Sequence, residues 1–166
     1  MADARPALAL FAAVSLAMPG VLAARDSLGV FSGWAAFRDP GVPRCYAIGK
    51  AQPSRARREF QPYAAIGTWP KRKVRGQVHF RLSRTIRQGS DIALTVGERS
   101  FELRGGGADA WARGAAMDAA IVAAMRSADT MRVRATDRSG RRFTSTYRLA
   151  GSATAMDAAT VACARG

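Results

Sequence analysis

The sequence predicts a mainly β, α+β domain in which antiparallel strands are joined by two short helices. Apolar and polar residues alternate along several short segments, which is typical of half-buried strands. Residues that favour turns separate these segments and indicate hairpins. Two alanine-rich segments have the composition of helices, because alanine has the highest helix propensity. We therefore expect one antiparallel domain with two helices.

Two short strands open the predicted domain, over residues 34–37 and 45–48. The segment between them contains Asp39-Pro40-Gly41, which favours a turn because proline presets φ and glycine accepts positive φ. Residues 50–62 contain two prolines and an arginine cluster. We expect this stretch to be a loop.

Two further strands follow the loop. Residues 64–69 have the length of a strand, which Pro70 ends. Between Val78 and Leu82 apolar residues alternate with polar ones, which predicts a half-buried strand. His79, the single histidine of the chain, falls on the polar face of this strand. Its expected position is therefore the solvated surface.

The next two strands form a predicted hairpin. Leu94 and Val96 share one face of the first strand, and Phe101 and Leu103 share one face of the second. Apolar residues meet if Val96 lies opposite Phe101 and Leu94 lies opposite Leu103. The loop is then residues 97–100, and we expect these four side chains on one buried sheet face.

A second hairpin has a register that its loop determines. A three-residue loop over 138–140 places Phe143 opposite Ala135 and Tyr147 opposite Met131. This loop class requires glycine at its left-handed position, where the chain has Gly140. A slip by one residue would reverse every side chain, so the register is well specified. The outer face of this hairpin is then lined by Arg132, Arg134 and Arg148.

Two alanine-rich segments, 116–126 and 155–165, are identical at eight of eleven positions and predict the two helices. Asp118 and Asp157 are expected in first turns, where the helix dipole favours a negative charge. Thr154 resembles the start of a capping box. Both a duplication and independent solutions of the same packing problem explain the repeat.

The N-terminal segment predicts export. Residues 7–18 form an apolar run that is too short to span a bilayer, and small residues follow at the expected cleavage site. Cleavage after Ala23 and cleavage after Ala24 fit equally well, and a buried N-terminal helix is the alternative. We predict a signal peptide over 1–24 and a single domain over 25–166.

Cys45 and Cys163 are the two cysteines of the chain. In an oxidising compartment an even pair predicts a disulfide. A catalytic thiol is the alternative, and it would need a nearby base, for which His79 is the one histidine available.

The formal net charge is +14, which favours polyanionic partners. A GC-rich genome that enriches arginine is the alternative explanation. Export argues against nucleic acid as the usual partner and favours anionic lipid or lipopolysaccharide. Trp69, which lies between two basic runs, is interpreted as a core residue, with a stacking surface as the alternative. The candidate anion-binding residues are Arg55, Arg57, Arg58, Lys71, Arg72, Lys73 and Arg75, expected at opposite ends of the 64–69 strand.

Between Phe31 and Cys163 the chain resembles the invasion-associated locus B family of exported bacterial proteins. This resemblance implies a β-sandwich-like domain in the periplasm or outer envelope, with a role in host interaction. Some members carry a cysteine where this chain has Arg38. The residues that carry the resemblance are Trp34, Cys45-Tyr46-Ala47, Trp69-Pro70, Phe101-x-Leu103, Trp111, Asp118, Ala124-Met125-Arg126, Met131-x-Val133, Tyr147-x-Leu149-x-Gly151 and Cys163.

The sequence contains no catalytic motif, no cluster of metal ligands and no nucleotide-binding fingerprint. Residues 105–107 are three glycines, interpreted as a flexible strand-to-helix connection. We therefore expect a non-enzymatic envelope protein without metal or cofactor, which acts by binding or assembly on an envelope or host component. The alternatives are a secreted cationic protein that binds anionic lipid, lipopolysaccharide or nucleic acid, and an envelope hydrolase with a carboxylate pair assembled in space.

Overall fold

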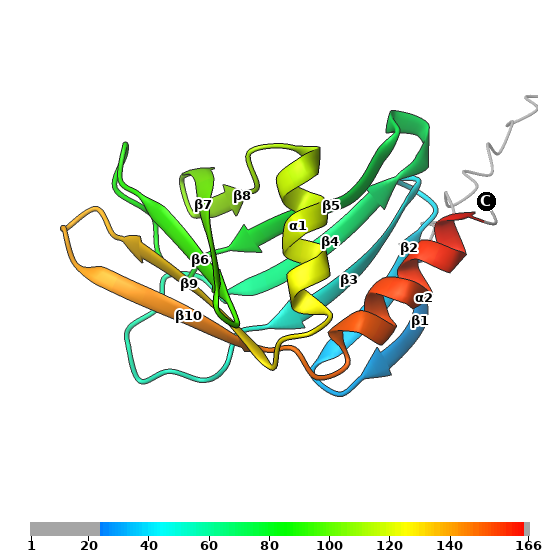
Figure 1. Ribbon diagram of the computed structural model, residues 1–166, viewed down its shortest axis with the longest axis horizontal. Helices are drawn as coiled ribbons and strands as arrows, with labels where there is room; N and C mark the ends of the chain where they lie inside the picture. Colours follow the sequence, from blue (N-terminus) through cyan, green and yellow to red (C-terminus); the bar gives the residue numbers. More distant parts are fainter. Residues whose placement is uncertain (1–23, 165–166) are drawn as a thin grey trace, which may run out of the picture.

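The computed structural model describes residues 24–164, so all but the last residue of the predicted signal peptide lies outside the described residues. Ten strands and two α-helices form this part of the chain (Figure 1). The strands are β1 (Asp26–Phe31), β2 (Trp34–Asp39), β3 (Arg44–Lys50), β4 (Tyr63–Trp69), β5 (Val74–Arg81), β6 (Ile92–Val96), β7 (Arg99–Gly106), β8 (Asp109–Trp111), β9 (Thr130–Thr136) and β10 (Arg142–Arg148). The helices are α1 (Ala115–Met125) and α2 (Ser152–Ala164), and a short 3₁₀ helix, η1, covers Pro70–Arg72.

All paired strands are antiparallel, in the order β1-β2-β3-β4-β5-β8-β7-β6-β9-β10. The sheet curves so that its two halves face each other. The rings of Phe80 on β5 and Tyr147 on β10 lie 5.9 Å apart, and the Trp34 indole on β2 donates a hydrogen bond to the Arg148 carbonyl oxygen at 2.9 Å. The mainly β, sandwich-like α+β fold class is therefore confirmed. The strands β1 and β8 were not predicted.

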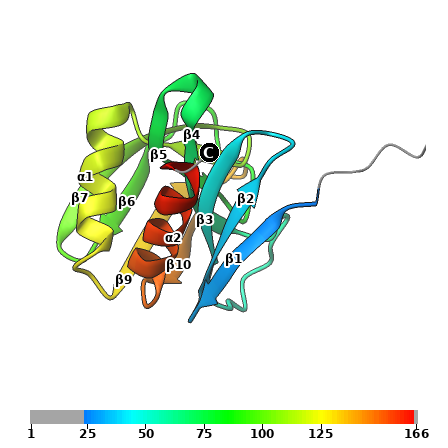
Figure 2. The same ribbon diagram turned by 90° about the vertical axis from the view of Figure 1, so that its right-hand side faces the viewer.

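The two helices cover the inner face of the sheet. Helix α1 packs on β5, β6 and β7, whereas α2 packs on β1 to β4 (Figure 2). The core between them is one continuous cluster in which Trp34, Phe80 and Tyr147 are the largest fully buried side chains. Within residues 24–164, no helix is both long and apolar enough to cross a membrane.

The hairpin β6–β7 has a different register from the predicted one. Leu94 lies opposite Phe101, and Val96 lies opposite Arg99, so the pairing is shifted by two residues. The loop is the two residues Gly97-Glu98, and Gly97 has a φ of 55°. A two-residue loop with glycine first is a favoured hairpin turn because its twist matches that of the strands. Matching apolar side chains alone was the wrong criterion.

The hairpin β9–β10 has the predicted register. Phe143 lies opposite Ala135, and Tyr147 lies opposite Met131. The Asp137 N–H donates to the Arg141 carbonyl oxygen at 2.9 Å and closes the predicted three-residue loop. The Asp137 carboxylate accepts a hydrogen bond from the Ser139 hydroxyl at 2.7 Å. That hydrogen bond, together with others from Arg141 and Arg84, holds the pKa of Asp137 well below its usual value.

Three local predictions, one on the glycines and two on the start of the second helix, were wrong. Gly105 and Gly106 belong to β7, and the turn that follows leads to β8 rather than to a helix. Helix α2 begins at Ser152, so Thr154 lies inside the helix instead of at its cap, and Asp157 lies beyond the first turn. Asp157 instead accepts a 2.6 Å hydrogen bond from Arg126 at the end of α1. The two similar segments are thus set differently in their helices.

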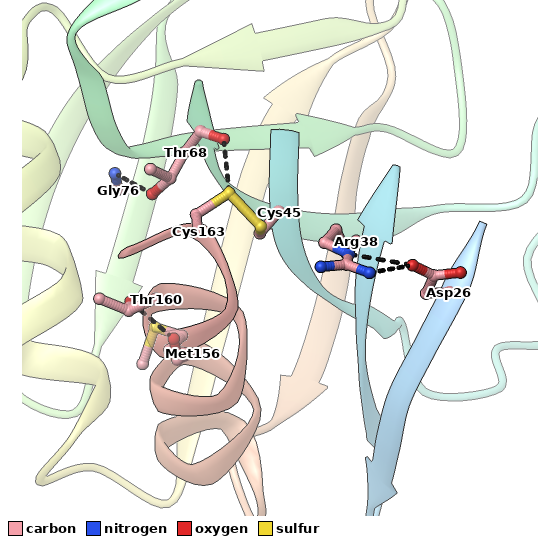
Figure 3. The surroundings of a disulfide bond; sticks show 8 residues. All are labelled: Asp26, Arg38, Cys45, Thr68, Gly76, Met156, Thr160 and Cys163. Carbon is pink, nitrogen blue, oxygen red and sulfur yellow. Dashed lines mark hydrogen bonds and ion pairs between the residues drawn. A yellow bond between two sulfur atoms is a disulfide. The ribbon is translucent and has the colours of Figure 1, made fainter. Parts of the chain in front are cut away.

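The predicted pairing of the two cysteines is confirmed. The Sγ atoms of Cys45 and Cys163 lie 2.07 Å apart in a disulfide (Figure 3). Cys45 is buried in β3, and Cys163 lies in the last turn of α2. The bond fastens the C-terminal helix to the strand that it covers.

Asp118, in the first turn of α1, supports β5 where the sheet is incomplete. The short strand β8 pairs only with residues 79–81, so the Val78 N–H has no strand partner. The buried Asp118 carboxylate accepts a hydrogen bond from this N–H at 2.8 Å. Burial raises the pKa of Asp118 because desolvation disfavours the ionised carboxyl.

We expect Asp118→Ala to lower the free energy of unfolding by about 1–3 kcal/mol, because a buried N–H loses its acceptor. Asp118→Asn keeps a side-chain oxygen that accepts this hydrogen bond, so its free energy of unfolding should fall by less. Because the raised pKa makes folding less favourable as Asp118 ionises, the Asn variant gains stability relative to the wild type as the pH rises from 3 to 7. Urea unfolding across this range measures the difference. The prediction is contradicted if the free energy of unfolding of the Asn variant falls relative to that of the wild type as the pH rises from 3 to 7.

Candidate functional site

The predicted basic residues form two separate groups. Arg55, Arg57 and Arg58 lie on the connection between β3 and β4. Lys71, Arg72, Lys73 and Arg75 lie on η1 and at the beginning of β5. As expected, these groups occupy opposite ends of β4 (Figure 1). The structure therefore does not bring the seven residues together as one surface.

A further group of arginines lies on the outer face of the hairpin β9–β10. We call Arg132, Arg134, Arg142 and Arg148 the arginine face. All four side chains are exposed, and none forms an ion pair within residues 24–164. The sequence predicted three of them on this outer face, and the register adds Arg142.

Every arginine of this face lies opposite a threonine. Arg134 pairs with Thr144, and Arg132 pairs with Thr146. At the two ends of the hairpin the arginine is on β10 and the threonine on β9, with Arg142 opposite Thr136 and Arg148 opposite Thr130. Like charges directly opposite each other destabilise a sheet, and this arrangement avoids them. The result is a positive surface along the hairpin, with two neighbouring arginines on β9, one arginine at each end of β10 and a threonine hydroxyl across from each charge.

A cavity at the edge of β10 extends this surface. It has a volume of about 470 Å³, and its lining includes Arg58, Arg84 and Arg142 together with residues 51–54. Arg84 is already paired with Asp137, at 2.9 Å. Arg58 donates to the Gln52 carbonyl oxygen at 2.8 Å. One of the seven predicted residues, Arg58, thus lies beside the arginine face.

A second surface lies on the outer face of β3, β4, β5 and β8. We call it the aromatic trough: a groove of about 490 Å³ that runs over Ala65 and Gly67 and is flanked by Tyr46, Tyr63, Trp69 and Trp111. All four aromatic side chains are half-buried. The interpretation of Trp69 as a core residue was therefore wrong.

His79 is positioned by its neighbours in the trough. Its ring stacks on Trp111 with centroids 5.3 Å apart, and its Nε2 lies 2.9 Å from an Asp109 carboxylate oxygen. Arg81 donates to the other oxygen of Asp109 at 2.6 Å. Asp109 is thus shared by two basic side chains, and the predicted solvated His79 is instead a packed wall of the trough.

Two neighbouring carboxyl groups, those of Glu59 and Asp137, have structural partners. Glu59 accepts hydrogen bonds from the Thr85 N–H and hydroxyl, both at 3.0 Å, and these lower the pKa of Glu59. Asp137, whose pKa is also lowered, is its carboxylate neighbour. A general acid working beside a second carboxylate needs a raised pKa, which neither group has. No cluster of three or more potential metal ligands occurs among the described residues 24–164.

Comparison with known protein families, curated proteins and solved structures found no match to this chain. The features of this chain that bear on function are therefore the two surfaces and the disulfide. Sequence reasoning missed the aromatic trough, although the alternation of Tyr63, Ala65, Gly67 and Trp69 along β4 was a usable signal.

Proposed function

We propose that this protein is an exported envelope protein of the invasion-associated locus B type that acts by binding rather than by catalysis. It works in the periplasm or outer envelope, and its partner carries phosphate groups, as anionic lipids and lipopolysaccharide do. The single observation that carries the proposal is the arginine face. The disulfide supports export, because such bonds persist in oxidising compartments.

The arginine face suits a phosphate-bearing surface for two physical reasons. A guanidinium group binds phosphate oxygens through two parallel hydrogen bonds. Arg132 and Arg134 are two residues apart on β9, about 7 Å along the strand, and Arg142 and Arg148 lie diagonally across from them at about 7–8 Å. Neighbouring charges are therefore about one screening length apart at physiological salt. The neighbouring carboxylate Glu102 does not neutralise them, since it is hydrogen-bonded to Arg113.

The test compares two variants that each lose four positive charges. One is Arg132→Gln with Arg134→Gln, Arg142→Gln and Arg148→Gln, and the other is Lys71→Gln with Arg72→Gln, Lys73→Gln and Arg75→Gln. Each arginine at an anionic membrane surface contributes about 1 kcal/mol. We therefore expect the first variant, which loses four of these contributions, to bind vesicles that contain phosphatidylglycerol about 1000-fold more weakly at physiological salt. The second variant should lose less than tenfold.

Parallel titrations with lipopolysaccharide and with a DNA duplex identify the source of the phosphate groups. Equal losses in the two variants would show that net charge alone drives binding. A larger loss in the second variant, or in Arg55→Gln with Arg57→Gln and Arg58→Gln, would move the site to the predicted loops. If the unmodified protein binds neither vesicles nor lipopolysaccharide, genome composition is the better account of the charge. Preferential binding to the duplex would favour nucleic acid as the partner.

A further inference from the structure

The aromatic side chains of the trough are not required by the core. The core is covered by α1 and α2 on the inner face of the sheet, whereas Tyr46, Tyr63, Trp69 and Trp111 lie on the outer face. Two of the three tryptophans of the chain are therefore held at the surface. Half-exposed aromatic rings gathered on one face of a protein indicate an interaction site.

The sequence of β4 forms the floor of the trough. On this face β4 presents Tyr63, Ala65, Gly67 and Trp69, so two small residues lie between two large ones. The Trp69 indole lies across Gly67, since a Cβ atom at Gly67 would approach its ring carbons to 2.6 Å. Any larger residue at 67 would displace the indole. Small residues therefore form the floor of the groove, and the Trp69 ring covers part of it.

The polar atoms of the rings are free to bind a ligand. Within residues 24–164, the indole nitrogens of Trp69 and Trp111 form no hydrogen bond, in contrast to that of the buried Trp34. The same applies to the hydroxyl groups of Tyr46 and Tyr63. The Arg44 guanidinium lies 4.8 Å from the centre of the Tyr46 ring, and its buried Nε has no partner. The trough therefore combines flat apolar faces with unused donors.

The charges of the trough are nearly balanced, which separates it from the arginine face. Arg25 and Arg44 each lie 3.4 Å from Asp39, and Arg81 lies 2.6 Å from Asp109. A nucleic acid strand would require unneutralised cations along its phosphates. A ligand bound by stacking and by hydroxyl groups does not require them.

We propose that the aromatic trough binds a glycan chain. The apolar C–H faces of successive sugar rings pack on the aromatic rings, and the sugar hydroxyls accept hydrogen bonds from the indole and phenol groups. This site goes beyond the proposed phosphate-binding function, because it lies on the other half of the sheet and uses different chemistry.

The test uses the purified disulfide-bonded protein with chitohexaose, cellohexaose and peptidoglycan sacculi as probes. We expect saturable binding of at least one of these three in calorimetry or sedimentation. Since base stacking on one aromatic side chain is worth about 1–3 kcal/mol by alanine substitution, we expect comparable stacking of sugars. Trp69→Ala and Trp111→Ala should therefore each weaken binding about tenfold or more. Ala65→Gln, which raises the floor without removing a ring, should weaken it similarly.

Phe101→Ala is the control, because Phe101 is a half-buried aromatic residue on β7, outside the trough. It should leave glycan binding within twofold of the wild type. The trough variants should keep their vesicle affinity, so failure of this proposal is distinguishable from failure of the proposed function. The proposal is overturned if no probe binds, if the tryptophan variants bind as the wild type does, or if an oligothymidylate binds more tightly than every glycan.

Discussion

Replacing Cys45 and Cys163 together by serine is expected to lower the free energy of unfolding by about 4–5 kcal/mol. The two cysteines are 118 residues apart, so the bond closes nearly the whole domain into one loop. In the chain-entropy model, a loop of that length loses the most freedom in the unfolded state, and unfolding becomes correspondingly less favourable. For a domain of this size the loss corresponds to a fall in Tm of roughly 10–20 °C.

Thermal unfolding with and without dithiothreitol measures this effect. Dithiothreitol should lower the Tm of the wild type most of the way to that of the double variant. The Tm of the double variant should not change with the reductant. The double variant removes the free thiol that a single Cys45→Ser change would leave on α2. If the wild type unfolds at the same temperature with its disulfide intact and reduced, the bond does not stabilise the domain.

The contacts of α2 explain why this bond matters for more than loop entropy. The helix buries small side chains, Ala155 and Ala159, together with Met156 against the sheet. Small side chains bury little apolar area, and burial contributes about 25 cal/mol per Å². The disulfide therefore adds a covalent attachment at the last turn of a helix whose mostly small side chains bury little apolar area.

The sequence was most informative where a local rule excluded alternatives. The hairpin β9–β10 was predicted correctly because Gly140 selects one loop length and the alternating side chains then select one register. The hairpin β6–β7 was missed by two residues because an apolar match is satisfied by any even shift. The decisive signal there was Gly97-Glu98, a loop motif that outweighs the contact between two side chains.

The candidate site was less predictable because it depends on contacts between distant segments. The arginine face was partly predictable, since the positions of Arg132, Arg134 and Arg148 follow from alternation along two neighbouring strands. For the aromatic trough only the alternation along β4 was a usable signal, because Tyr46 and Trp111 come from β3 and β8, which are far apart in the sequence. A tryptophan before proline is usually a core residue, yet the alternation along β4 places Trp69 on the same outer face as Gly67, which its ring covers.

Gly151 is the residue at which we expect a single added methyl group to cost most. It precedes α2 with a φ of 84°, and a Cβ atom there would lie 2.0 Å from the Phe31 carbonyl oxygen at the end of β1. The left-handed conformation costs a residue with a side chain about 1–2 kcal/mol. Overpacking adds about 1–3 kcal/mol, and more where the neighbour is backbone that cannot rotate away.

We therefore expect Gly151→Ala to lower the free energy of unfolding by about 3–5 kcal/mol, measured by urea unfolding of the oxidised protein. Gly140→Ala is a matched control, because Gly140 has a φ of 80° but nothing within 4 Å of its Cβ position. The control should lose only the backbone cost of about 1–2 kcal/mol. The difference between the two variants isolates the contact with β1. Hydrogen exchange should then show faster exchange in β1 of Gly151→Ala than in β9, whereas equal losses in both variants would mean that the edge strand moves aside without cost.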